Sequence, residues 1–285
     1  ARLAAAAAPG DVISHVFYIN CEGDYERSAN IEAQLDLHLP TTPRTRLPCV
    51  SASALLAGDE AVPAEIDVAD YLATSDDLEF AYVSIAIYLS HRKAFLKIRE
   101  LPADGRYLVL EDDVVLSADI ASVLRNVLIA LDGEDWDVVA LDVGIEGHTH
   151  VGVETTRPFI SERCIDAAQQ LYEQGEVVAR LNGGCAHASI GGALISWAGA
   201  QKLTQSALPV ERPVDTHVER LVRDGSLQAW ASLPAVAHVD GRNTSDSVRR
   251  YLRVEGQHVH YTFRADDESL PTCFDTPCQI TVAVE

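Results

Sequence analysis

The stretch LVLEDDVVLSADI, residues 108–120, decides the fold because it sets three acids between a buried strand and a helix. The apolar residues 108–110 predict the strand. Ser117 then precedes a helical pattern of apolar side chains at Ile120, Val123, Leu124, Val127 and Leu128. Glu111, Asp112 and Asp113 lie between the two, and adjacent carboxylates repel one another. A solvated turn with a helix cap would account for the triplet, and so would a bound divalent cation.

Strands and helices alternate along the chain around this stretch. The pattern predicts strands at 12–20, 46–51, 108–110 and 137–141, helices at 28–37, 78–99 and after residue 117, and a loop at 58–77. Such alternation indicates the α/β class, with a mainly parallel sheet flanked by helices. Ligands of these sheets bind beyond the carboxyl ends of the strands, where the acidic triplet and the turn after Asn20 both lie.

The chain divides into three predicted parts. Residues 1–11 form a low-complexity N-terminal segment, residues 12–255 one domain, and residues 256–285 an irregular C-terminal extension. The longest apolar run, AYVSIAIYL, is about half of the roughly 20 residues that a membrane span requires. We therefore expect a soluble protein without a transmembrane segment, in the cytoplasm or in the lumen of the secretory pathway.

The net charge of −21 argues against nucleic acid and anionic membranes as main partners. An anionic small substrate stays possible, because a divalent cation can invert the sign of the charge at a site. The six cysteines suggest no clear framework. Four lie beside apolar residues and are predicted to be buried thiols, namely Cys21, Cys49, Cys164 and Cys185. The other two, Cys273 and Cys278, lie close enough in the tail to form a disulfide.

A bound cation would remove the repulsion within the triplet, and Mg²⁺ or Mn²⁺ completes its shell with substrate phosphates and water. The glycine-containing segments NGGCAH (182–187) and SIGGAL (189–194) match neither of the common phosphate-binding loops. The metal would then have to bind the phosphates. A sugar nucleotide, which carries a diphosphate leaving group, fits this arrangement.

Five segments in order resemble glycosyltransferase family 25, which includes bacterial lipopolysaccharide glycosyltransferases and collagen galactosyltransferases. They are VFYINCEGDYERSANIEAQL (16–35), YLSHRKAFLKI (88–98), LVLEDDVVLSADI (108–120), GGALISWAGAQKLTQSALPVERPVD (191–215) and LPAVAHVDGRNTSDS (233–247). The resemblance implies a GT-A fold, a Rossmann-like α/β sheet that binds a UDP-sugar donor with Mn²⁺ or Mg²⁺ as cofactor. It further implies an inverting displacement.

The resemblance also implies roles for individual residues. Glu111 and Asp113 would bind the metal, with His238 as a late third ligand, and Asp112 would face the ribose or the sugar. Asp215, in the P-V-D segment, would be the catalytic base. The chemistry of the residues leaves simpler roles open: Asp215 as a helix cap and His238 as a core histidine.

Five further residues are predicted to contact the donor, namely Asn20, Glu22, Arg27, Ser90 and His91. A capped turn with an exposed arginine is the alternative for the first three. Ser90 could instead bond a carbonyl within its helix, and His91 could be an ordinary surface residue. The chain departs from the family pattern at Val83, Ser84 and the pair Cys21-Glu22, near the expected donor site.

The function that the resemblance implies is transfer of a sugar from a UDP-sugar to a hydroxyl of a glycan or glycoprotein acceptor, with galactose as the favoured sugar. The alternative is a divergent member of the fold with weak catalysis that acts as a glycan-binding or structural module.

Overall fold

A seven-stranded sheet forms the centre of the protein in a computed structural model, which describes residues 12–75, 77–142, 162–182, 185, 190–205, 214–239, 259–262 and 281–284. The strands in sheet order are β2 (Arg44–Pro48), β1 (His15–Asn20), β3 (Arg106–Glu111), β7 (Gly192–Ser196), β5 (Val138–Ala140), β8 (Ala229–Ser232) and β6 (Val178–Leu181). The strands β1, β2, β3, β5 and β8 run in one direction, and β7 and β6 run opposite to it. The predicted α/β class with a mainly parallel sheet is confirmed.

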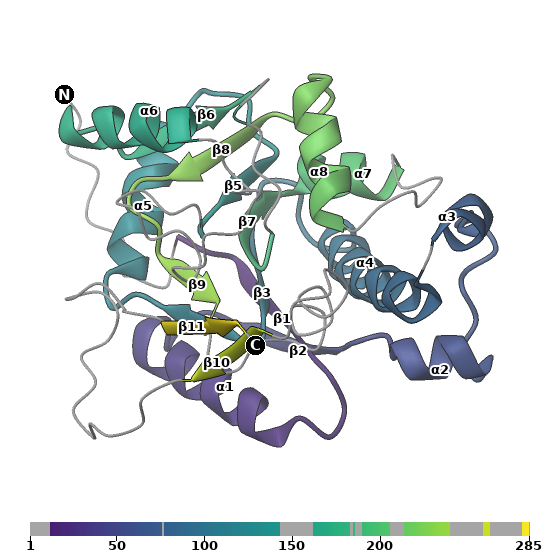
Figure 1. The fold of residues 1–285 in the computed structure, drawn as a ribbon. Coiled ribbons are helices and arrows are strands. Elements are labelled where there is room, and N and C mark those ends of the chain that lie inside the picture. The colour runs from purple at the N-terminus through teal and green to yellow at the C-terminus, as the bar shows by residue number, and fades with distance from the viewer. Residues whose placement is uncertain are drawn as a thin grey trace.

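Helices cover both faces of this sheet (Figure 1). One face carries α4 (Leu78–Arg99), α7 (Trp197–Gln205) and α8 (Val214–Arg223), and the other carries α1 (Tyr25–His38) and α5 (Ile120–Ala130), while α6 (Glu162–Glu173) packs beside β6. Alternate residues of β1 enter the two layers: Phe17 and Ile19 join the α4 side, and Val16 and Tyr18 join the α1 side. Strands buried on both faces are therefore apolar along their middle, as residues 16–19 of β1 and 107–110 of β3 are.

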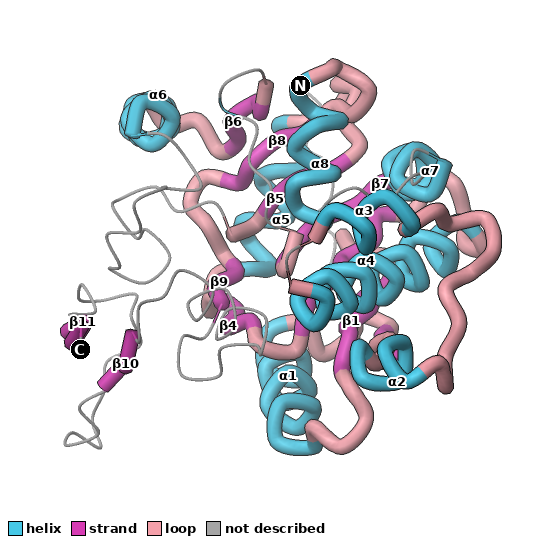
Figure 2. Tube along the Cα trace, turned by 45° about the vertical axis from the view of Figure 1, so that its right-hand side comes forward, coloured by secondary structure: helices cyan, strands magenta, loops and turns pink. Residues whose placement is uncertain are grey.

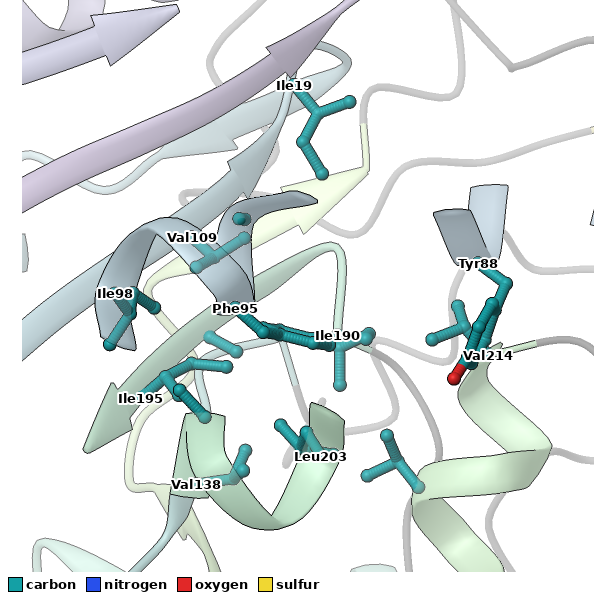
Figure 3. Packing of buried hydrophobic residues seen from close by; sticks show 14 of the residues in the cluster. Ile19, Tyr88, Phe95, Ile98, Val109, Val138, Ile190, Ile195, Leu203 and Val214 are labelled. Carbon is teal, nitrogen blue, oxygen red and sulfur yellow. The ribbon is translucent and has the colours of Figure 1, made fainter. Parts of the chain in front are cut away.

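The longest helix, α4, begins and ends at residues 78 and 99, as the sequence predicts. Asp77 caps it by accepting a hydrogen bond from the Phe80 N–H at 3.0 Å, and Lys97 and Arg99 lie near its carboxyl end, where cations are favourable. Figure 3 shows Phe95 and Ile98 of this helix among the residues of the core. This packing fixes the height of α4 above the sheet.

Two short helices that precede α4 in the chain were not predicted. The first, α2 (Ala52–Ala57), begins after Ser51, whose hydroxyl accepts from the Ala54 N–H, and ends at Gly58 in the left-handed region. The second, α3 (Ala69–Thr74), lies within the stretch 58–77 that was predicted to be a loop. Each has six residues, too few for a helical period to stand out from the sequence.

The region after the acidic triplet also corrects the prediction. A short strand, β4 (Val114–Leu116), follows the acids and pairs antiparallel with β9 (Ala237–Val239), and the two lie side by side in Figure 2. Helix α5 begins only after Asp119, so Ser117 is not its cap. Glu111 thus ends β3, and Asp112 and Asp113 occupy the turn between β3 and β4. Within the segment predicted to be an irregular extension, β10 (Val259–Thr262) and β11 (Thr281–Val284) form an antiparallel pair.

The strand β9 crosses the carboxyl edge of the sheet because two backbone N–H groups at its start are bonded to the segment after β5. The Leu141 carbonyl accepts hydrogen bonds from the N–H groups of Val236 (2.8 Å) and Ala237 (3.0 Å). Gly192, the first residue of β7, lies under this crossing, and a Cβ at its position would be 2.7 Å from the Ala237 Cβ. Only glycine leaves room for so close an approach.

Candidate active site

Glu111 ends β3 at the carboxyl edge of the sheet, with its backbone N–H donating to the Gly191 carbonyl at 2.7 Å. Its Oε1 lies 2.8 Å from Nε2 of His91, which α4 supplies from the layer above. The His91 side chain is 1% exposed and the Glu111 side chain 30%. The pair therefore presents its glutamate end outward, and the predicted site residues Glu111 and His91 are in direct contact.

Asp113 is the most buried acid of the triplet, with 3% of its surface exposed. Its Oδ1 is buried and accepts no hydrogen bond from the described residues. Burial, with the neighbouring charges of Glu111 and Asp112, raises the pKa of Asp113 to about 8. A carboxylate in this position is unfavourable near neutral pH unless a positive charge joins it.

Asp112 contacts residues of β1 and α1. Its Oδ2 accepts from Asn20 Nδ2 at 2.6 Å, and its Oδ1 lies 3.5 Å from Nη1 of Arg27, which also pairs with Asp24 at 3.3 Å. Burial raises the pKa of Asp112, while the Asn20 and Arg27 contacts oppose that shift. The structure thus brings together three of the predicted donor residues, Asn20, Arg27 and Asp112.

The other predicted donor residues lie differently. Glu22 is exposed in the turn after β1. Ser90 is buried, and its hydroxyl donates to the Ala86 carbonyl at 2.7 Å and accepts from the Val50 N–H at 2.8 Å. The bond within the helix is the alternative that the sequence left open. Ser90 thereby ties α4 to the segment after β2.

Two further acids, Asp215 and Asp142, lie close enough to Glu111 or to each other for their charges to interact. Asp215 is the second residue of α8, and burial, then the charges of Glu111 and Asp142, raise the pKa of Asp215 to about 8. A backbone hydrogen bond from Ile190 partly offsets these effects. The first residue of α8, Val214, joins the same apolar cluster as Tyr88 of α4, and Figure 3 labels both. This packing fixes the start of the helix near Glu111.

Asp142 was missed by the sequence analysis. It follows β5 by two residues, is 1% exposed, and lies at the same edge because the Leu141 N–H donates to the Gly192 carbonyl at 3.0 Å. The available signal was an acid directly after the predicted strand 137–141, the pattern that also marks Glu111. The carboxyl edge therefore carries Glu111, Asp113, Asp142 and Asp215 close enough for their charges to interact.

His238 lies on β9, opposite Val115 of β4 in the antiparallel register. This register places its backbone beside the segment that follows Asp113. Among the described side chains, no three from His, Cys, Asp and Glu form a group that could hold a metal ion.

Four cysteines predicted to be buried thiols form two disulfides instead. Cys21 and Cys49 are joined, and so are Cys164 and Cys185. Cys21 and Cys49 directly follow the neighbouring parallel strands β1 and β2, so their Cα atoms lie 4.8 Å apart. The first bridge fixes the strand ends beside Asn20. Cys273 and Cys278 lie outside the described residues.

No helix in the described part of the chain is both long and apolar enough to cross a membrane. A search among curated proteins finds no match to the chain. A family model described as glycosyltransferase family 25 (LPS biosynthesis protein) matches residues 13–218, which include β1, the helix of His91, the acidic triplet and Asp215. With well over half of its length matched in this way, the chain belongs to glycosyltransferase family 25 and is a glycosyltransferase.

Proposed function

We propose that the protein catalyses metal-dependent, inverting transfer of a hexose from a UDP-sugar to a hydroxyl of a glycan or glycoprotein. Galactose is the favoured hexose. The observation that carries the proposal is the acidic cluster of Glu111, Asp113, Asp142 and Asp215 at the carboxyl edge, in which burial and mutual repulsion raise two pKa values to about 8. Such a cluster costs folding free energy in the absence of a cation, which favours a binding role.

The chemistry of the residues fits Mn²⁺ or Mg²⁺. Asp113 offers a buried Oδ1 that accepts no hydrogen bond from the described residues, and Glu111 offers the oxygen that His91 does not contact. Hard cations prefer such oxygens and take the remaining ligands from phosphate and water, so two protein carboxylates suffice. His238 is the proposed third ligand. When bound, the metal would offset the negative charge of the departing diphosphate.

Asn20, Arg27 and Asp112 would form the wall of the donor site. Asp112 and Asp24 hold the Arg27 guanidinium from two sides, with 22% of the Arg27 side chain left exposed. A guanidinium held in this way can still offer N–H groups to a phosphate or a base edge. Glu22, exposed in the adjacent turn, would border the same site.

Asp215 would act as the base. As the acceptor oxygen attacks the anomeric carbon, Asp215 takes the proton of that hydroxyl, and the bond to UDP breaks with its electron pair leaving on the diphosphate. A carboxylate whose pKa is raised to about 8 is a stronger base than an ordinary one, and a cation bound nearby would favour its deprotonated form. Inversion follows from the single displacement.

Release of UDP from UDP-galactose tests the proposal, measured with Mn²⁺, with Mg²⁺ and with EDTA, with and without simple glycoside acceptors. Mn²⁺-dependent release that rises with acceptor supports it, and the anomeric configuration of the product, read by NMR, tests inversion. The control variant is Asp119→Asn, which changes an exposed acid at the start of α5, outside the acidic cluster, and should keep this release. Thermal unfolding that responds to a glycan but not to UDP with Mn²⁺ would favour the glycan-binding module instead.

The two disulfides support a location in an oxidising compartment, because such bonds are rare where glutathione keeps thiols reduced. Of the two expected locations, we therefore propose the secretory-pathway lumen or an equivalent oxidising compartment. Alkylation of the native protein under non-reducing conditions, followed by mass analysis, tests this. Labelling of Cys21 or Cys164 in protein taken directly from cells would contradict it.

A further inference from the structure

We propose that His91 is a positioning residue, whose Nε2–H fixes one oxygen of the Glu111 carboxylate so that the other oxygen faces the metal and donor. The inference rests on the proposed function and deepens it, since it gives His91 a role through Glu111 in place of the donor contact predicted from the sequence. Its basis is the 2.8 Å contact between His91 Nε2 and Glu111 Oε1.

The partners on each side determine which ring nitrogen carries the proton. A carboxylate only accepts hydrogen bonds, so Nε2 of His91 must be the donor. Nδ1 is buried and has no hydrogen-bond partner among the described residues. A proton on Nδ1 would be a buried donor without an acceptor among the described residues, which is costly, so the geometry favours the proton on Nε2.

The surroundings of His91 hold the ring in place. The side chain is 1% exposed, the Phe95 ring lies one turn further along α4 with its centroid 6.1 Å away, and Ser90 bonds the helix to the Val50 N–H. A donor locked by packing can orient its partner without entropy loss when a ligand binds. His91 has no exposed surface with which to bind the donor itself.

The other oxygen of Glu111 lies beside Gly191. A Cβ at Gly191 would lie 3.7 Å from Glu111 Oε2, an ordinary contact distance, so no side chain of residue 191 covers this oxygen. The Gly191 carbonyl also accepts from the Glu111 N–H at 2.7 Å. Glu111 is thus held at its backbone and at Oε1, and only Oε2 remains for a ligand.

The test compares His91→Gln, His91→Leu and wild type by titration with Mn²⁺ alone, in which electron paramagnetic resonance measures the free ion. The same titration is then repeated in the presence of UDP. Glutamine can place an amide N–H near the position of Nε2, and leucine cannot donate. Loss of an orienting partner typically weakens a metal site about 10- to 100-fold. We expect that loss for His91→Leu and recovery to within about threefold of wild type for His91→Gln.

Thr204→Ala is the matched control. Thr204 is buried on α7, which packs against α4, and its hydroxyl bonds the Ala200 carbonyl and the Arg99 guanidinium. This variant loses a buried hydrogen bond in the same helical layer and should lower the unfolding temperature without changing Mn²⁺ affinity. Equal affinity in His91→Leu and wild type refutes the inference, and so does weakening in His91→Gln as large as that in His91→Leu.

A second measurement does not depend on activity. Long-range proton–nitrogen NMR of the histidine rings should show the Nε2–H form for His91, identified by the signal lost in His91→Gln, and this signal should shift in Glu111→Gln. An Nδ1–H ring overturns the inference. A wild type that binds no Mn²⁺ overturns the proposed function and the inference together, whereas normal binding by wild type and His91→Leu alike overturns the inference alone.

Discussion

Replacing Asp113 with asparagine should stabilise the metal-free protein at neutral pH. The carboxyl is 3% exposed, and burial with the charges of Glu111 and Asp112 raises its pKa to about 8. A group whose folded pKa is raised contributes stability below its unfolded pKa, near 4, and loses it as pH rises through the folded pKa. The slope is about 1.4 kcal/mol per pH unit, so between pH 4 and pH 7 the loss reaches at most about 4 kcal/mol.

Asparagine has nearly the same shape and no charge at any of these pH values, so Asp113→Asn should remove this pH dependence. For a chain of this size, we expect an unfolding temperature about 5–10 °C above wild type at pH 7.5 in EDTA. The difference should shrink to near zero at pH 4.5, and Mn²⁺ with UDP should raise the temperature of wild type only. Calorimetry at several pH values checks this, with the exposed Asp119→Asn as control. A difference that is absent at pH 7.5, or that does not grow with pH, would refute the reasoning.

Three further outcomes are expected. Asp215→Asn should lower transfer by about 10²- to 10⁴-fold while Mn²⁺ and UDP still bind, measured by UDP release and by titration; near wild-type turnover would move the base elsewhere. Cys21→Ser with Cys49→Ser should cost about 2–4 kcal/mol in the free energy of unfolding, measured by urea denaturation, and should raise the donor KM because the strand ends beside the donor site loosen. Gly192→Ala should lower the free energy of unfolding by about 1–3 kcal/mol in the same assay, because its Cβ would lie 2.7 Å from the Ala237 Cβ. An unchanged midpoint would show that β9 can move away without a cost in stability.

The parts of the fold that depend on nearby residues could be predicted from the sequence. The helix at 78–99 has an acidic cap, an apolar face and a basic end, all within one segment, and its bounds agree with α4. The strand before the acidic triplet was recognised from its apolar run. The three-residue strand β4 was not, since its pairing with β9 joins segments more than 100 residues apart and no local pattern records it.

The site divides in the same way. The acids 111–113 are adjacent in sequence and were found as a group, whereas Asp142 enters the cluster only through the sheet order, which places β7 between β3 and β5. The disulfide between Cys21 and Cys49 was missed although Cys21 directly follows the predicted strand 12–20 and Cys49 lies within the predicted strand 46–51. Taking those two strands as parallel neighbours would have brought the cysteines together.

The antiparallel strand β7 is what allows acids from separate elements to meet. Because it runs opposite to β3 and β5, its first residues, rather than its last, lie at the carboxyl edge between Glu111 and Asp142. Gly192 is the first residue of β7 and Gly191 directly precedes it, and the two glycines add no side chain between the two acids and leave room for β9 to cross above them. A Cβ at Gly192 would lie 2.7 Å from the Ala237 Cβ and would displace it, and a Cβ at Gly191 would lie in contact with Glu111 Oε2, at 3.7 Å. The pair of glycines, which matches no phosphate-binding loop, therefore serves the site by leaving it open.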